Sequence, residues 1–105
     1  MRKWIYRGRQ QVTDDSNQRI CLEYYLEEDL REIKVHTCLY GIGIVMSREW
    51  NGETITEKSH TPAISCSREF VEVLLEKLKR MTVTPTSLAE VVDDELYTVR
   101  IGSCV

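Results

Sequence analysis

Long apolar runs are missing from this chain of 105 residues, and no stretch of it is apolar enough to span a bilayer. Its first ten residues are basic and lack the apolar segment that a secretory signal needs. We therefore expect a cytoplasmic protein without membrane contact. The chain also has few glycines and prolines and no repetitive segment, which excludes a low-complexity or disordered class. Its length predicts one domain over residues 1–105.

Closely spaced metal ligands are missing as well. The chain has four cysteines and two histidines, but no Cys-x-x-Cys or His-x-x-x-His pattern. We therefore expect no metal and no cofactor, and we expect the cysteines to be unligated thiols in a reducing compartment. These residues are Cys21, His36, Cys38, His60, Cys66 and Cys104.

Glycine is sparse, and its one close pair, Gly41 and Gly43, lacks the third glycine and the lysine of a phosphate-binding loop. The pair interrupts a run of β-forming residues, where glycine is typical of a bulge. We therefore interpret the two glycines as part of a bulged strand.

Alternating apolar residues and turn residues predict an antiparallel β-meander of about four strands. Asn51-Gly52 is the strongest hairpin signal, because both residues accept positive φ angles. A helix over residues 22–30 is an alternative, but the period-2 pattern favours a strand. The predicted strands cover residues 2–12, 18–26, 31–48 and 53–60.

Two helices are predicted to follow the meander, which gives an α+β fold. An apolar stripe covers about residues 67–81, and Ser65 or Ser67 is placed to cap this helix. Thr84 and Pro85 have the residue types of an N-cap and a first helical position, so they predict a second, short helix. Residues 97–101 alternate and predict an extra strand in the tail.

Acidic residues crowd the predicted C-terminal end of the second helix, where the helix dipole disfavours negative charge. Such a violation of a local rule marks either a pairing partner or a function. We expect Arg100 or the basic N-terminal strand to supply the pairing. The acidic residues are Asp93, Asp94 and Glu95.

The order of these segments resembles a family of small proteins of unknown function from clostridia-like bacteria. The resemblance covers about residues 20–96, and its most specific element is Val83-Thr84-Pro85-x-x-Leu88 after the leucine-rich helix. Other matching segments are Tyr40-Gly41-Ile42-x-Ile44, Asn51-Gly52, Ile64-Ser65 and Val91-Val92-Asp93-Asp94-Glu95-Leu96. The resemblance implies a bacterial, cytoplasmic setting but no activity, cofactor or catalytic residue.

The sequence favours an interaction or regulatory module without catalytic activity. Its partner is a protein, with a second copy of the chain as one option, bound through an edge strand at residues 2–8 or 97–101. The candidate interface residues are Trp4, Tyr6, Trp50, Asp93, Asp94, Glu95, Tyr97 and Arg100.

Two alternatives remain open. The first is a thiol enzyme or redox sensor centred on Cys66, close to a helix N-terminus, with His36 or His60 nearby in space. The second is binding of nucleic acid or another anionic partner by the basic N-terminal strand. A net charge of −3 disfavours nucleic acid, but aromatic residues between basic ones suit single-stranded bases. This strand contains Arg2, Lys3, Trp4, Tyr6, Arg7 and Arg9.

Overall fold

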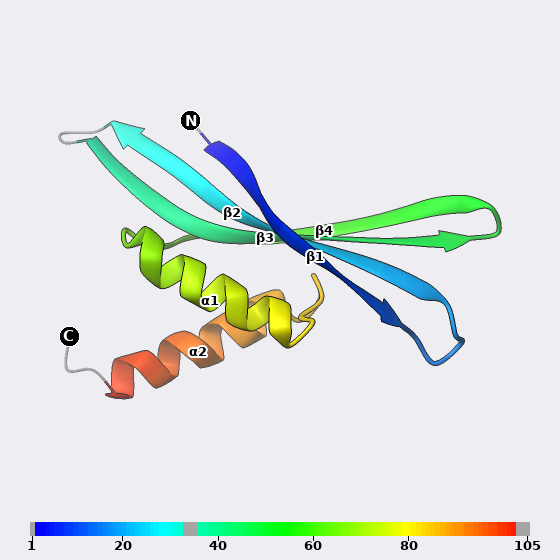
Figure 1. Cartoon of the computed structure of the whole chain (residues 1–105). Helices are drawn as coiled ribbons and strands as arrows, with labels where there is room; N and C mark the ends of the chain where they lie inside the picture. The colour runs from blue at the N-terminus through cyan, green and yellow to red at the C-terminus, as the bar shows by residue number, and fades with distance from the viewer. Residues whose placement is uncertain (1, 33–35, 103–105) are drawn as a thin grey trace.

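The computed structural model describes residues 2–32 and 36–102 and shows a four-stranded sheet followed by two helices (Figure 1). All neighbouring strands are antiparallel, and their order in the sheet is β1-β2-β3-β4. The predicted α+β meander is therefore confirmed. None of the described helices is long and apolar enough to cross a membrane. The elements are β1 (Arg2–Thr13), β2 (Arg19–Glu32), β3 (His36–Trp50), β4 (Glu53–Ser65), α1 (Arg68–Arg80) and α2 (Leu88–Gly102).

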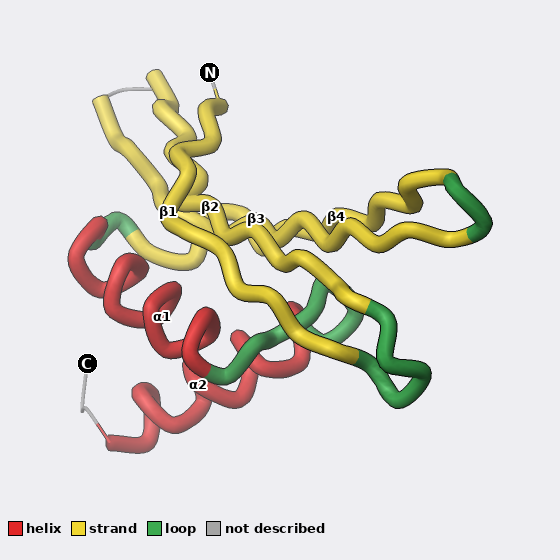
Figure 2. Tube along the Cα trace, turned by 45° about the vertical axis from the view of Figure 1, so that its right-hand side comes forward, coloured by secondary structure: helices red, strands yellow, loops and turns green. Residues whose placement is uncertain are grey.

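The sheet is long and strongly twisted, so that the connections β1–β2 and β3–β4 point in different directions (Figure 2). Residues 22–30 lie within β2, which rules out the helical alternative. The alternating pattern of these residues favours the strand, because Leu22, Tyr24 and Leu26 are all fully buried on one face of the sheet.

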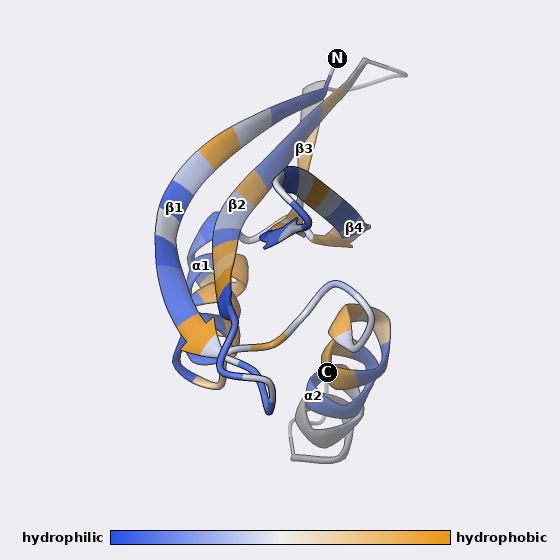
Figure 3. Ribbon diagram, turned by 90° about the vertical axis from the view of Figure 1, so that its right-hand side faces the viewer, coloured by the Kyte–Doolittle hydropathy of each residue, from blue (hydrophilic) through white to orange (hydrophobic). Residues whose placement is uncertain are grey.

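The core lies between that face and the two helices. Residues at even positions of β2 and β3 point into it, and α1 contributes one apolar stripe. Figure 3 shows apolar residues, in orange, interspersed with hydrophilic ones along the strands and α1. The buried residues are Leu22, Tyr24, Leu26, Ile42, Ile44, Val71, Leu74, Leu75, Leu78, Val83, Leu88 and Val92. Both helices therefore cover the same side of the sheet, which we call the inner face.

The first helix begins as predicted. Ser67 is the N-cap, and its hydroxyl accepts a hydrogen bond from the backbone N–H of Phe70 at 3.2 Å. The hydroxyl of Ser65 instead accepts from the N–H of Ser67 at 3.0 Å, so it shapes the entry into the helix. The prediction of a cap at one of these two serines is confirmed for Ser67.

The second helix differs from the prediction at both ends. It begins at Leu88, because Thr84–Ser87 form a turn in which the N–H of Ser87 donates to the carbonyl of Thr84 at 3.1 Å. It continues to Gly102, so the predicted strand at residues 97–101 is wrong. Leu88 and Val92 are buried at a helical spacing of four, and Leu96 packs against the core one turn later. This stripe anchors α2 to the core as far as Leu96.

The acidic residues Asp93, Asp94 and Glu95 consequently lie inside α2, with more than a turn of helix after them. The conflict with the helix dipole therefore disappears, because that effect is confined to the last turn. Glu95 pairs with Lys77 of α1 at 2.9 Å, and this ion pair links the two helices.

Tyr24 connects the sheet to the segment between the helices. It is fully buried, and its hydroxyl donates to the carbonyl oxygen of Val83 at 2.9 Å. Burial raises the pKa of Tyr24 to about 12, because the phenolate would lose its hydration.

Tyr24 makes the stability of the fold sensitive to alkaline pH. In the unfolded chain the phenol ionises near pH 10, so between pH 10 and about 12 the unfolded chain binds fewer protons than the folded one. The contribution is complete below pH 10, and the free energy of unfolding falls as the pH rises through this window. Urea denaturation over this pH range measures the fall in the free energy of unfolding. The fall should be less steep in Tyr24→Phe, because that variant has no phenol at this position.

Candidate functional site: a buried carboxylate–histidine pair on the outer face

A trough without side chains runs along the other face of the sheet, which we call the outer face. It is formed by Gly41 and Gly43, both buried in β3. A Cβ atom at Gly43 would lie 2.6 Å from the Trp4 ring, and one at Gly41 would lie 2.3 Å from the carbonyl oxygen of Thr61. Because the glycines have no side chain, the Trp4 ring is able to pack against Gly43 and the backbone of β4 against Gly41. We call this feature the glycine trough.

The predicted bulge occurs at Gly41, but the extra residues lie in the partner strand β4 and not in β3. β3 pairs with β2 in unbroken register, and the irregularity lies in the pairing of β3 with β4. Between the pairs Tyr40–Ser65 and Ile42–Thr61, one residue of β3 faces residues 62–64 of β4. The extra residues belong to β4, where Ala63 has a positive φ of 52°.

Trp4 reaches the glycine trough from the edge strand β1. Its ring lies over Gly43, 5.4 Å from the ring of Tyr25 and 6.1 Å from the ring of His60, between centroids. Tyr6 meets Tyr25 edge-to-face at 5.7 Å. Burial, followed by the negative charge of Glu23, raises the pKa of Tyr25. An aromatic cluster therefore covers the middle of the outer face.

Glu27 of β2 contacts His60 of β4 across the intervening strand. Strands two apart in a sheet are separated by roughly 10 Å, so this contact requires that β3 carries no side chain between them. The Oε2 atom of Glu27 lies 2.9 Å from Nδ1 of His60, and its Oε1 atom lies 3.3 Å from Nε of Arg2. The glycine trough is what allows the pair to form.

The Glu27 carboxylate is fully buried, although it lies on the face that the helices leave uncovered. Burying a carboxylate costs several kcal/mol unless charges and hydrogen bonds compensate. Arg2 supplies a charge, and His60 supplies a hydrogen bond when its Nδ1 carries the proton. Oε1 itself has no aligned hydrogen bond among the described residues. The Glu27 carboxylate thereby holds the side chains of Arg2 and His60 in place.

A cavity of about 340 Å³ opens beside this pair. It is bounded by β1 on one side and by β4 on the other, with the buried carboxylate in its wall. Its volume falls within the range of small-ligand sites, roughly 300–1,000 Å³. We call it the Trp4 cavity, and its lining residues are Arg2, Trp4, Glu27, Lys58, Ser59 and His60.

The candidate interface residues are spread over three parts of the molecule. Trp4 and Tyr6 lie on the outer face, whereas Trp50 is 57% exposed next to the turn between β3 and β4. The α2 residues Asp93 and Asp94 are exposed, Tyr97 is 65% exposed, and Glu95 pairs with α1. The side chain of Arg100 lies outside the described residues. Of these candidates, among the side chains that the structure describes, Trp4 lines the Trp4 cavity, and Tyr6 belongs to the neighbouring aromatic cluster through its contact with Tyr25.

Within the described part of the chain, the thiol hypothesis gains no histidine partner from the fold. Cys66 is exposed just before the Ser67 cap, and it is not among the residues that line the Trp4 cavity. The side chain of His36 lies outside the described residues, and His60 is engaged by Glu27. In the described part of the chain, no three His, Cys, Asp or Glu side chains form a group that could hold a metal ion.

The basic residues of β1 are largely matched by acidic residues of the fold. Arg2 lies near Glu27 and Asp29, Lys3 lies 3.8 Å from Glu28, and Arg7 pairs with Glu72 of α1. Charges that are neutralised within the protein attract a phosphate backbone less. The nucleic-acid alternative is therefore weakened.

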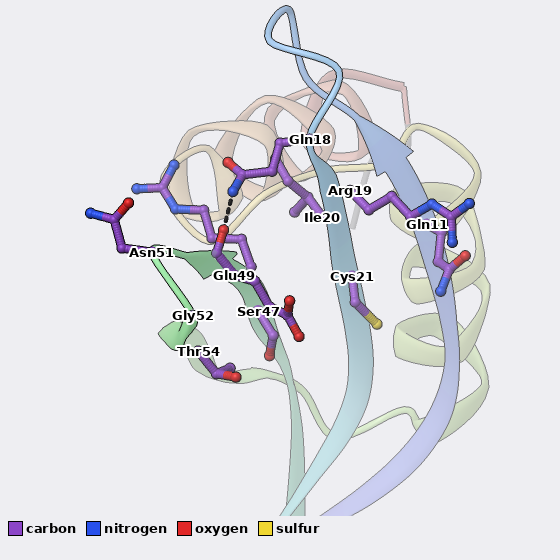
Figure 4. A pocket seen from close by; sticks show the side chains of 11 residues that line it. Gln11, Gln18, Arg19, Ile20, Cys21, Ser47, Glu49, Asn51, Gly52 and Thr54 are labelled. Atoms are coloured by element: carbon purple, nitrogen blue, oxygen red, sulfur yellow. Dashed lines mark hydrogen bonds between the residues drawn. The ribbon is translucent and has the colours of Figure 1, made fainter.

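A larger concavity of about 650 Å³ lies between the diverging hairpin ends (Figure 4). Gln18 donates from its side-chain amide to the carbonyl oxygen of Glu49 there, and Arg48 has a buried Nε without a hydrogen-bond partner in the described structure. Each residue that lines the concavity is at least partly exposed. The Trp4 cavity differs in having a fully buried charged group, so it is the stronger candidate.

Comparison with known protein families assigns most of the chain to one family. The model of DUF6514, a family of unknown function, matches residues 3–97. The chain belongs to the DUF6514 family. The resemblance to a family of unknown function is thereby confirmed, and the match includes residues 3–13 of β1, which the predicted range of about 20–96 left out. Searches of curated proteins and of solved structures found no match to the DUF6514 chain.

Sequence reasoning missed the central pair of this DUF6514 chain. Glu27 stands in an acidic run with Glu28 and Asp29, which is typical of a solvated surface, and His60 is 33 residues away. One signal was present in the sequence. Gly41 and Gly43, spaced by two in a strand, leave one face of that strand bare and permit contacts between its neighbours.

Proposed function

We propose that this chain is a binding module, and that a ligand or partner group docks on the outer face of the sheet in the Trp4 cavity. The observation that carries the proposal is the fully buried Glu27 carboxylate, held between His60 and Arg2 beside that cavity. A buried, paired charge on a face that no described helix covers is costly to maintain, and a pocket with a few convergent polar groups is the usual form of a binding site.

The geometry favours this face over an edge strand as the binding surface. β1 and β4 are the two edges of the sheet, and strand addition at an edge is a common mode of recognition. A register shift between Tyr6 and Arg9, with Gly8 at φ 115°, interrupts β1. The shift at residues 61–65 interrupts β4. Bulges of this kind discourage pairing with another strand.

Three probes that share a benzene ring test the location of the site: benzoate, benzylammonium and benzyl alcohol. We expect at least one of them to shift the amide resonances of Gly43 and His60 and the indole N–H of Trp4 in ¹⁵N–¹H correlation spectra. Val73, 66% exposed on α1, reports binding elsewhere on the surface. The proposal fails if none of the three probes shifts the cavity resonances more than that of Val73.

A further inference from the structure

We infer that the group received by the Trp4 cavity is an anion, of carboxylate or phosphate type. This inference rests on the proposed function and names the chemistry of the same site. The sign of the ligand's charge follows from the charges that are accessible on the cavity wall.

Glu27, the one acidic residue that lines the cavity, is not accessible to a ligand. Glu27 is fully buried, and its two oxygens face Nδ1 of His60 and Nε of Arg2. Oε1 lacks an aligned hydrogen bond, but a donor group of a ligand would have to displace Arg2 to reach it. A cationic ligand therefore meets no accessible negative charge on the cavity wall.

The accessible charged groups are cationic. Lys58 is exposed, and it makes no ion pair within the described structure. The side chain of Arg2 is 54% exposed, and the contacts with Glu27 and Asp29 involve its Nε atom. The Lys58 ammonium supplies the unmatched positive charge of the cavity. The charge of Arg2 is matched by Glu27 and Asp29, but those contacts involve Nε and not its terminal N–H groups, which remain hydrogen-bond donors on the same wall. Together the two side chains complement a carboxylate or phosphate, which bind such groups through charge-assisted hydrogen bonds.

The rest of the wall suits a planar group beside the anion. The rings of Trp4 and His60 lie 6.1 Å apart at an interplanar angle of 49°, so they form two sides of the cavity. The His60 side chain is 40% exposed while its Nδ1 faces Glu27. The ring therefore offers its face to the planar part of the ligand, and its orientation is fixed by the buried carboxylate.

The test uses the same probes on the Trp50→Phe chain, in which Trp4 is the one remaining tryptophan. We expect benzoate to quench or shift Trp4 fluorescence with saturation, and benzylammonium and benzyl alcohol to do so only at much higher concentration. Inorganic phosphate forms a separate arm. A stronger response to phosphate than to acetate assigns the site to phosphate groups, and the reverse assigns it to carboxylates.

Two matched variants separate a built site from general charge attraction. Lys58→Gln removes a charge from the cavity, and we expect it to weaken benzoate binding roughly tenfold, the loss of one charge-assisted hydrogen bond. Arg9→Gln removes the same charge from an exposed position that does not line the cavity, and it should leave binding unchanged.

The possible results are distinct. Preferential binding of benzylammonium at the cavity, or equal effects of Lys58→Gln and Arg9→Gln on benzoate, would overturn the anion inference while the binding site itself stands. No response of the cavity to any probe would overturn the proposed function together with this inference.

Discussion

Leu78→Ala is expected to lower the free energy of unfolding by about 2–5 kcal/mol, as is typical for a leucine removed from a close-packed core. Leu78 is fully buried, and it lies on the stripe by which α1 packs against the sheet. Truncation loses the transfer free energy of the side chain and leaves a cavity that neighbours fill only in part. A domain of this size has about 5–15 kcal/mol of stability in total, so the variant should unfold at much lower urea concentration.

Val73→Ala is the matched control for this change. Val73 lies on the same helix but is 66% exposed, so its truncation should change the free energy of unfolding by no more than about 0.5 kcal/mol. Equal effects of the two substitutions would contradict the placement of α1, because its packing against the sheet requires that one side chain is enclosed and the other is not.

Gly41→Ala should destabilise the fold by about 3 kcal/mol, at the upper end of the usual range for overpacking. The new Cβ would lie 2.3 Å from the carbonyl oxygen of Thr61 and 2.9 Å from the Cα of Pro62. Both obstacles are backbone atoms of β4, next to the register shift that begins at Thr61. The clash is relieved only when β4 moves away from β3, which loses ladder hydrogen bonds. Urea denaturation of the variant measures this loss.

Gly43→Ala is the informative comparison. Its Cβ would meet ring atoms of Trp4 at 2.6–2.9 Å, and Trp4 is a partly exposed side chain that is free to move outward. We expect a smaller loss of stability, about 1 kcal/mol, together with loss of the probe response at the Trp4 cavity. If Gly41→Ala lowers the free energy of unfolding no more than Gly43→Ala does, the close passage of β4 over Gly41 is contradicted.

Local signals carried most of the fold prediction. Asn51 has a φ of 52° and Gly52 a φ of 80°, as the hairpin turn between β3 and β4 requires, so two adjacent residues were enough to place it. The N-cap at Ser67 and the apolar stripe of α1 were equally local. The strand nature of residues 22–30 followed from alternation, because one face of β2 is buried.

The second helix shows why local signals sometimes mislead. Thr84 and Pro85 suit the start of a helix, but they begin a turn, and Pro85 is buried. Residues 97–101 alternate like a strand, yet they continue a helix whose buried stripe begins at Leu88. Both segments fit two local structures, and packing of α2 against the core decides between them.

The candidate site could not be predicted because it depends on long-range register. Glu27, His60 and Arg2 come from three strands, and they meet only because each hairpin aligns its strands as it does. Trp4 was identified from its residue type as a contact residue, but nothing local showed that its ring lies over Gly43. The acidic run of β2 gave no sign that one of its carboxylates is fully buried.

Intermolecular nuclear Overhauser effects from bound benzoate test the central claim most directly. We expect contacts from the benzoate ring protons to the indole protons of Trp4 and to the ring protons of His60, and we expect these contacts to disappear in Gly43→Ala. Contacts confined to other surfaces, such as the exposed side of α1 around Val73, would contradict the claim that the Trp4 cavity is the binding site of this protein.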